Sequence, residues 1–469
     1  MSLAAPSPTR SIALDAIPDL ALRLRAGFGS GRTRPAAFRL EQLGRLRALL
    51  TENSDALEHA LAADLRKPDP EGYATDIGFT IGEIDLARKG LRRWMKPRRV
   101  PTPLKVRPAQ SRVVPEPLGV VLIIAPWNYP VQLALAPLAA AIAAGNAALV
   151  KPSEVTPHVA AALGELLPRY LDPECFAVAL GGVPETQALL AERWDHIFYT
   201  GNGRVGRIVM AAAAKHLTPV TLELGGKSPC LVDAECDLDI AARRIVWGKF
   251  LNCGQTCVAP DYILVDASRE SELIERMVHH LRAFYGEDPQ RSPDLARIVN
   301  EQHVDRLAKL LESGTTVVGG HVDRADRYIA PTILRDVSPD SPVMQDEIFG
   351  PILPVLPVAN LDEAIAFVNA RPKPLALYVF SSREATKDAV VARTSAGGVC
   401  INATLWHLSN PNLPFGGVGE SGIGAYHGRS GFDVFSHQKS VLEKSTRMDP
   451  SIGYPPYTKW KKALIKRFV

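Results

Sequence analysis

Hydrophobic residues along this chain follow two periods, and the change from one to the other divides it into parts. Between Phe38 and Trp94 they recur every three or four positions, as in LGRLRALL and ALEHALAADL, which predicts a layer of helices. From Pro97 to Pro117 prolines and alternating Val and Arg exclude helix and indicate an extended arm. A strand left unpaired invites aggregation, so we expect the arm to pair with another subunit or with the extended segment 432–442.

From Gly119 onward, short apolar strands alternate with helices. The predicted strands are 120–125, 147–151, 176–180, 196–200 and 220–224, and the predicted helices are 131–144, 159–170, 185–192 and 205–215. This alternation favours a parallel sheet with helices on both faces. Such sheets bind ligands at the carboxyl ends of their strands.

The alternation restarts after Gly225 and predicts a second domain of the same kind. Its predicted strands are 230–233, 262–265, 315–320, 328–334, 376–380 and 397–402, and its predicted helices are 238–247, 270–285, 303–313 and 361–370. We therefore predict an α/β protein with two doubly wound domains and a β-arm.

Length and composition narrow the class. A chain of 469 residues is too long for one core, and a net charge of +4 is too mild to indicate a nucleic-acid partner. Six cysteines do not make a secreted disulfide framework, and the N-terminus lacks a signal-peptide pattern, so we predict a cytoplasmic protein. The longest apolar run, 131–150, is interrupted by Pro137, Gly145 and Asn146, which argues against a transmembrane segment.

Two residues stand out as candidate chemistry. Glu223 is an isolated carboxylate between apolar runs in VTLEL, and Cys257 follows a Gly-Gln-Thr turn. A buried acid with a thiol is a plausible hydrolase or thioester-forming pair, although their spacing does not show that they meet. Cys253 lies four residues before Cys257 and could trap it on oxidation. The pair has no third or fourth ligand nearby, so we predict no metal site.

A glycine pattern complicates the reading of Glu223. It spells G-x-G-x-x-G after a predicted strand and before a predicted helix, through Gly201, Asn202, Gly203, Arg204, Val205 and Gly206. An acidic residue about 20 positions on normally holds the adenosine ribose of a dinucleotide, and Glu223 fits that position. The pattern alone would assign Glu223 to a cofactor.

Longer motifs resolve the choice by resemblance. TLELGGKSP, NCGQTCVAPDYIL, EIFGP and PFGGVGESGIGAYHG resemble the aldehyde dehydrogenase superfamily, in its class 3 and coniferyl-aldehyde branch, from about Phe38 to about Leu442. The resemblance implies that Cys257 attacks the aldehyde to form a thiohemiacetal and then a thioester. It makes Glu223 the general base that activates water. It also assigns the Asn128 amide, in PWNYP, to the oxyanion, together with the Cys257 N–H.

The same resemblance implies NAD or NADP as cofactor, with the preference open. Lys151 and Glu154 of KPSE would contact the adenosine ribose, and the glycine stretch would touch phosphates. Glu347 would bind the nicotinamide ribose, and Phe349 would pack by the ring. Trp406 and His407 are expected at the substrate mouth, which suits aromatic or medium-chain aliphatic aldehydes equally.

The resemblance also implies an organisation. Residues 1–96 and 118–224 would form the NAD(P)-binding domain, 225–424 the catalytic domain, and 97–117 with 425–445 an oligomerisation arm that joins a homodimer. The tail 446–469 is basic and amphipathic, and it suits a membrane surface or a partner subunit.

Two rival functions remain. A coenzyme A-acylating or phosphate-using relative would pass the acyl group to another acceptor, but such relatives typically lack the acid found here at Glu223. A non-catalytic NAD-binding protein would not need Asn128, Glu223 and Cys257 together.

Overall fold

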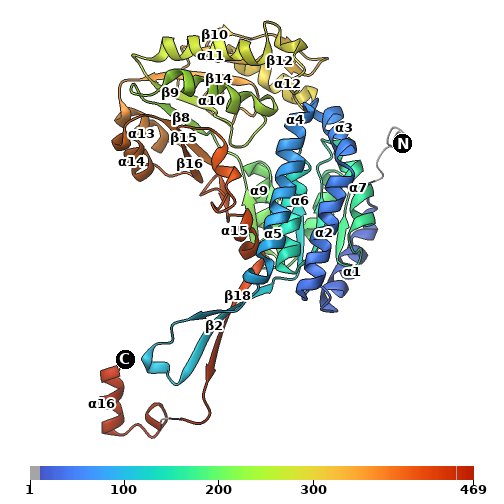
Figure 1. The fold of residues 1–469 in the computed structure, drawn as a ribbon, viewed down its shortest axis with the longest axis vertical. Coiled ribbons are helices and arrows are strands. Elements are labelled where there is room, and N and C mark those ends of the chain that lie inside the picture. The colour runs from blue at the N-terminus through green and yellow to red at the C-terminus, as the bar shows by residue number, and fades with distance from the viewer. Residues whose placement is uncertain (1–10, 450, 469) are drawn as a thin grey trace.

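The computed structural model describes residues 11–449 and 451–468, which form two α/β lobes with a projecting arm (Figure 1). Residues 1–10 lie outside the described part of the chain, and so do Pro450 and Val469 of the predicted tail. The prediction that the N-terminus is not a signal peptide rests partly on these first residues.

The first lobe is built on a six-stranded sheet. In spatial order its strands are β17 (Gly422–Ile423), β7 (Val220–Glu223), β6 (His196–Thr200), β3 (Val120–Ile124), β4 (Ala147–Lys151) and β5 (Phe176–Val178). All pairs are parallel except β17 with β7. Every residue of β3 and β4 is buried, as expected for parallel strands covered on both faces.

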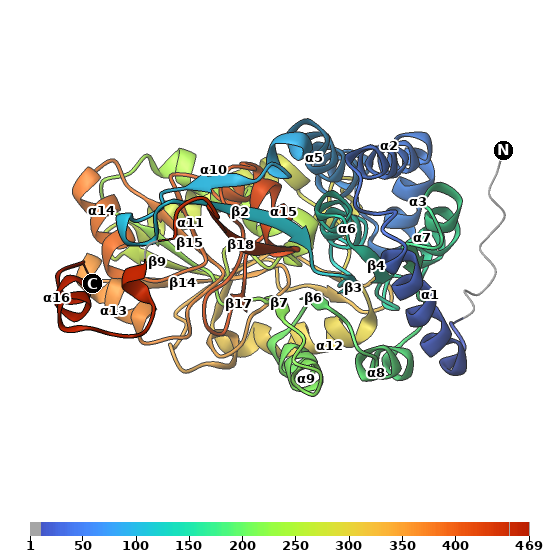
Figure 2. The same ribbon diagram turned by 90° about the horizontal axis from the view of Figure 1, so that it is seen from below.

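Helices cover both faces of this sheet. They are α1 (Ile17–Gly29), α2 (Ala36–Glu52), α3 (Ser54–Leu65), α4 (Asp69–Gly72), α5 (Phe79–Trp94), α6 (Gln132–Ala144), α7 (Pro157–Tyr170), α8 (Val183–Ala191) and α9 (Gly203–Ala214). The N-terminal helices α2, α3 and α5 pack on α6 and α7 as the predicted helical layer, while α1, α8 and α9 lie on the opposite side (Figure 2). Helix α1 lies before the region where helices are predicted.

The second lobe is built on a seven-stranded sheet. In spatial order its strands are β10 (Thr315–Val318), β13 (Thr332–Arg335), β14 (Ile352–Val358), β9 (Tyr262–Asp266), β8 (Pro229–Val232), β15 (Ala376–Phe380) and β16 (Gly398–Ile401). Only the edge strand β10 is antiparallel. No strand is predicted at β14, which contains Pro354 and Pro357 although it lies inside the sheet.

Alternate residues of these strands point into two separate cores. The core on one face includes side chains of α10 and α11, and the core on the other includes side chains of α12, α13 and α14. The helices of this lobe are α10 (Leu238–Phe250), α11 (Glu270–Tyr285), α12 (Glu301–Ala308), α13 (Leu361–Asn369) and α14 (Glu384–Arg393). A two-stranded sheet of β11 (Val322–Asp323) and β12 (Tyr328–Ile329) completes it. The predicted α/β class with two sheets is confirmed, although α14 is not predicted.

The arm is a three-stranded antiparallel sheet of β1 (Arg98–Val100), β2 (Ala109–Pro117) and β18 (Ser436–Lys444). Its register runs from Ser436 opposite Pro117 to Lys444 opposite Ala109, so the predicted pairing of the two segments is confirmed. The second segment starts later than predicted, because residues Gly428–Val434 form helix α15 against α5 and α6. Helix α16 (Lys459–Phe468) lies at the far end of the arm (Figure 1). No helix in the described part of the chain is both long and apolar enough to cross a membrane.

Candidate active site

Cys257 lies just after an unusual turn that joins α10 to β9. Three successive residues of this turn, Asn252, Cys253 and Gly254, have φ of 51°, 54° and 74°. This left-handed conformation is rare for residues with a side chain and persists only where neighbouring structure holds it. The turn therefore needs specific partners.

Gln255 supplies several of those partners. Its Nε2 donates to the main-chain oxygens of Asn252 at 3.1 Å and of Arg297 at 2.9 Å, and its Oε1 accepts the Val299 N–H at 2.9 Å. The side chain is buried with its donors and its acceptor satisfied, so it ties the turn to the loop at 297–299. We did not predict this role, because two of its partners lie about 40 residues away in the chain.

Asn128 reaches the same turn from the other lobe, in the loop between β3 and α6. Its Nδ2 donates to the Gln255 main-chain oxygen at 3.1 Å, which leaves the second amide N–H for another acceptor. The next residue, Tyr129, shares a hydrogen bond of 2.5 Å with the Thr256 hydroxyl. The predicted oxyanion residue thus lies beside the predicted nucleophile.

The pKa of the Cys257 thiol depends on the charges of two other predicted site residues. Burial raises its pKa well above the ordinary range, and the charges of Glu347 and Glu223 raise it further. The N–H groups of Cys257 and Val258 act in the opposite sense, since they lower the pKa by bonding the sulfur. The protein by itself therefore keeps the thiol protonated near neutral pH, with both carboxyl groups close by.

Glu223 ends β7, with its side chain buried and only 2% of the residue exposed. Neither of its carboxyl oxygens has a hydrogen-bond partner among the described residues. Burial raises the pKa of Glu223 well above its ordinary value, because a charged carboxylate is unfavourable where water is excluded. The main-chain oxygen of Glu223 accepts the Gly201 N–H at 3.0 Å. Its carboxyl is close enough to Cys257 for its charge to raise the pKa of that thiol, which favours the role of general base over the role of ribose ligand.

Glu347 and Phe349 lie on the facing segment of the second lobe. The Glu347 carboxyl lies so close to Gly225 that a Cβ there would be 2.1 Å from its Oε2. Burial, with the charge of Asp261 as a second cause, raises the pKa of Glu347 to about 8, and its Oε1 has no hydrogen-bond partner in the described structure. A buried acceptor without a partner could accept a hydrogen bond from a ribose hydroxyl. Phe349 lies edge-on to Trp127, with the ring centroids 5.2 Å apart.

The remaining predicted cofactor residues lie at the same edge of the six-stranded sheet. Lys151 ends β4 and donates to Glu154 at 2.6 Å, with the Lys151 side chain buried and that of Glu154 46% exposed. Asn202 caps α9, since its side chain accepts the Val205 N–H at 3.0 Å. The strands β3, β4, β6 and β7 thus bring the predicted site residues of this lobe to one edge, where doubly wound sheets bind nucleotides.

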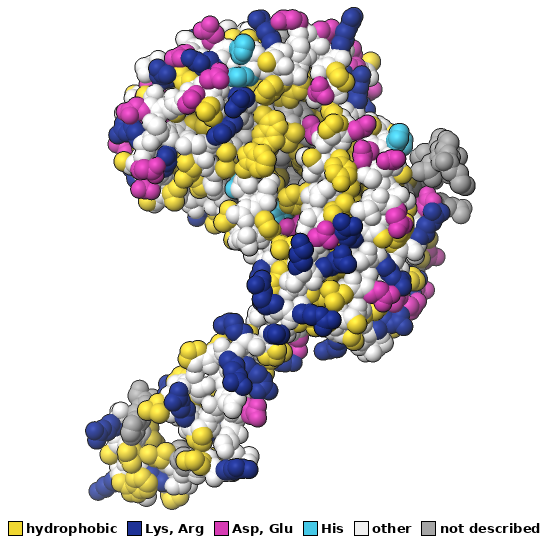
Figure 3. Space-filling view, viewed as in Figure 1, with side chains coloured by type: hydrophobic (Ala, Val, Ile, Leu, Met, Phe, Trp, Pro, Cys, Tyr) yellow, Lys and Arg dark blue, Asp and Glu magenta, His cyan; other side chains and the backbone are white. Residues whose placement is uncertain are grey.

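The predicted substrate mouth is aromatic. Trp406 is 61% exposed and stacks on Trp247 of α10, with ring centroids 5.8 Å apart. His407 is nearly buried beside Tyr378 and Phe415, and burial lowers its pKa to about 4, so it is neutral near pH 7. Hydrophobic side chains gather on the face of the second lobe that borders the first (Figure 3).

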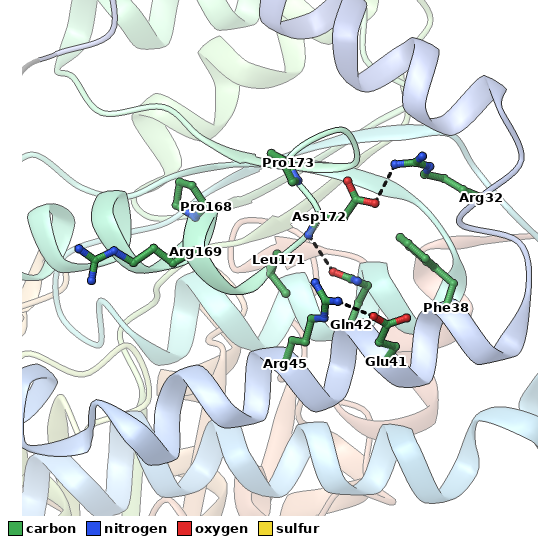
Figure 4. Close-up of a pocket in the computed structure, with 10 residues that line it drawn as sticks. All are labelled: Arg32, Phe38, Glu41, Gln42, Arg45, Pro168, Arg169, Leu171, Asp172 and Pro173. Atoms are coloured by element: carbon green, nitrogen blue, oxygen red, sulfur yellow. Dashed lines mark hydrogen bonds and ion pairs between the residues drawn. The ribbon is translucent and has the colours of Figure 1, made fainter.

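A hollow of about 520 Å³ lies elsewhere on the first lobe, between α2 and the end of α7 (Figure 4). Four of its charged residues form ion pairs with one another, Arg32 with Asp172 at 2.8 Å and Arg45 with Glu41 at 2.6 Å. No predicted site residue lines it, so we assign it no role in the chemistry. The described residues also contain no cluster of three or more His, Cys, Asp or Glu arranged to hold a metal ion.

A thiol, a carboxyl and an amide thus lie beside a sheet edge of the kind that binds nucleotides, an arrangement typical of an enzyme with a nucleotide cofactor. The model of the aldehyde dehydrogenase family matches residues 21–441, and the chain belongs to this family. The chain is 52% identical to the mouse dimeric NADP-preferring aldehyde dehydrogenase over 442 residues, which cover 94% of this chain and 98% of the relative. It is also 52% identical to mouse aldehyde dehydrogenase family 3 member A2 over 450 residues, 96% of this chain and 93% of that protein.

A solved structure agrees with this assignment. The substrate-bound state of Staphylococcus aureus AldH superposes with a TM-score of 0.94 at 49% identity, covering 96% of this chain and 99% of the other. The resemblance to class 3 is therefore confirmed, and the protein is an aldehyde-oxidising enzyme of this family.

Proposed function

We propose that this protein oxidises an aldehyde to the carboxylic acid through a covalent thioester on Cys257, which water activated by Glu223 then hydrolyses. The observation that carries the proposal is the space shared by Cys257, Glu223 and the Asn128 loop. The family resemblance assigns the roles of these residues, and that geometry and the chemistry of each group support the assignment.

The first half of the reaction forms the acyl-enzyme. The Cys257 thiol gives its proton to water and its sulfur attacks the carbonyl carbon, so that a C–S bond forms, the C=O π bond breaks and the oxygen becomes an oxyanion. The second N–H of the Asn128 amide and the Cys257 main-chain N–H donate to that oxygen. Lys151, Glu154 and Glu347 would hold NAD or NADP, which would supply the acceptor for the hydride that leaves the same carbon, so that the thiohemiacetal becomes a thioester.

The second half releases the product. Glu223 in its ionised form removes a proton from water, and the resulting hydroxide attacks the thioester carbon. The C–S bond breaks, the acid leaves, and the thiolate is restored. A buried acid whose two carboxyl oxygens have no hydrogen-bond partner among the described residues suits this task, because none of those residues competes with the water for the carboxyl.

We propose that either NAD or NADP supports turnover. Named relatives include NADP-preferring and NAD-dependent enzymes. The Lys151 side chain would hold a ribose hydroxyl, and the carboxylate of Glu154 would accept a hydroxyl hydrogen bond and so favour NAD. The half-exposed position of Glu154 lets it turn aside for a 2′-phosphate.

For the substrate we propose aldehydes with an apolar body, either aromatic or medium-chain aliphatic. The stacked pair of Trp247 and Trp406 offers an apolar wall at the mouth. The neutral His407 beneath it adds no charge that would select a polar substrate.

We further propose that the chain works as a homodimer joined by the arm. The name of a mouse relative calls that protein dimeric. The arm exposes apolar side chains such as Leu104 and Leu442, and β18 is an edge strand of its sheet. Trp460 of α16 is 55% exposed. Hydrophobic side chains lie together with Lys and Arg at the end of the arm (Figure 3). A partner subunit would cover it, and peripheral contact with a membrane surface is the weaker alternative.

The six described cysteines are all free, which supports a cytoplasmic location.

The test is NADH and NADPH formation with a panel of benzyl, cinnamyl, hexyl and decyl aldehydes, with the product identified as the acid. Formation of the acid without coenzyme A or phosphate is expected. A product that forms only with one of those acceptors would overturn the hydrolytic route, and no turnover with any aldehyde would overturn the proposal itself.

A further inference from the structure

A buried ion pair lies directly behind the Asn128 loop. Lys67 and Asp76 have fully buried side chains, and Lys67 Nζ donates to Asp76 Oδ2 at 2.8 Å. Removing two charges from water is costly, and the attraction between them offsets this cost only when further hydrogen bonds satisfy both groups. The further hydrogen bonds of this pair therefore show where its effect is felt.

Those bonds go to the two ends of the segment 128–132. Lys67 Nζ donates to the Asn128 main-chain oxygen at 3.2 Å and lies 4.1 Å from the centre of the Tyr129 ring. The other oxygen of Asp76, Oδ1, accepts the N–H groups of Val131 at 3.1 Å and of Gln132 at 3.2 Å. The pair thus forms hydrogen bonds with the loop both before and after the bend that leads into α6.

Local backbone geometry places both charges. Lys67 follows Arg66, whose φ of 48° ends α3 and turns the chain inward. Asp76 lies in the π-helical turn Tyr73–Gly78, which precedes α5. Such turns are rare and recur at functional sites, because the extra residue redirects side chains.

The same loop oxygen links the pair to the cysteine turn. Asn252 Nδ2 donates to the Asn128 main-chain oxygen at 2.8 Å, so Lys67 and Asn252 share one acceptor. Glu71, between Lys67 and Asp76 in sequence, accepts the Asn252 N–H at 2.9 Å. The short segment 67–76 therefore forms hydrogen bonds with both the Asn128 loop and the left-handed turn before Cys257.

We propose that Lys67 and Asp76 are positioning residues for acylation, which act by holding the Asn128 amide where the oxyanion forms. The inference rests on the proposed function of Asn128. Preorganised donors lose their effect when they are misplaced by about 1 Å, so the brace matters even though neither charge touches the substrate.

The test removes both charges together with Lys67→Met/Asp76→Leu, because a buried pair replaced by apolar residues is often neutral for stability. The single substitution Lys67→Met is the second variant. Removal of one oxyanion donor costs about 100- to 1000-fold in kcat, so loss of its support should cost about 10- to 100-fold, in kcat and not in KM. Alkylation of Cys257 by iodoacetamide, followed by mass at that residue, forms no oxyanion and should change less than about twofold.

The decisive comparison is made in the Asn128→Ala background. There the double substitution should cause no further loss, because residues that act through one another are not additive. Additive losses, unchanged aldehyde turnover, or melting temperatures that collapse in both variants would overturn the inference. A wild-type protein that oxidises no aldehyde would instead overturn the proposed function, so the two failures are distinguishable.

Discussion

Cys253 and Cys257 lie four residues apart in sequence but pack against opposite faces of the seven-stranded sheet. Cys253 is fully buried in the core that contains Leu231 and Leu264. Cys257 packs against the other core, beside α10. Cys253 lies within the left-handed turn between α10 and β9, and Cys257 follows that turn. A disulfide that traps Cys257 would therefore require one of the two thiols to leave its core.

We therefore predict different outcomes for the two cysteines. Cys257→Ala should lower aldehyde turnover by at least about 1000-fold, because no other group there can form the acyl-enzyme. Cys253→Ala, the matched control, should keep turnover within about threefold and lose stability through a small cavity. Steady-state NADH formation and NADH binding by fluorescence check both variants. Substantial turnover in Cys257→Ala would contradict its role.

Glu223→Gln should separate the two halves of the reaction. Acylation does not need the base, so rapid mixing should show a burst of about one NADH per site, followed by a stall. The product of the burst should be a thioester on Cys257, visible by mass. The control is Cys257→Ala, which should give no burst. Unchanged steady-state turnover in Glu223→Gln would remove its assignment as the base.

Much of the fold followed from hydrophobic periodicity. The strands β3, β4, β6 and β7 are predicted because each is a short apolar run between helices. Strand β14 is not predicted, since Pro354 and Pro357 are unusual inside a sheet and only the tertiary pairing shows its place. Segment boundaries near α15 also differ, because packing against α5 and α6 selects helix there.

The site residues also fall into two groups, those that the sequence predicts and those that only the structure shows. Cys257, Glu223 and Asn128 were reached by motif resemblance, and the structure brings them together from three separate elements. The roles of Gln255 and Lys67 were not, since each acts through partners that are distant in the chain. A residue pattern shows which chemistry is present, whereas hydrogen bonds across the two lobes show what holds it in place.

Glu347 should make stability depend on pH in a defined direction. Its folded-state pKa of about 8 lies above its ordinary value of 4.5. Its contribution to stability is therefore fully present below pH 4.5 and is lost as the pH rises through about 8. Glu347→Gln does not titrate, so its melting temperature relative to wild type should rise between about pH 5 and about pH 9. A difference that stays constant over this range would contradict the shift.

Gly254 should prove irreplaceable for a reason beyond its dihedral angle. It has φ of 74°, and a Cβ there would lie 2.3 Å from the Gly350 main-chain oxygen. Gly286 has nearly the same φ, 77°, but a Cβ there would meet no atom within 4 Å, which makes it a matched control.

Gly286→Ala should therefore lose only the cost of its unusual backbone conformation, with φ of 77° and ψ of −175°, which is about 1–3 kcal/mol of unfolding free energy, with turnover unchanged. Gly254→Ala should lose about 1–3 kcal/mol more through overpacking against Gly350. Because the clash pushes the Cys257 turn away from the segment that carries Glu347, turnover should fall by at least about tenfold. Urea unfolding and aldehyde kinetics on the two variants check this. Equal losses of stability and equal activity would show that the contact with Gly350 does not position the thiol.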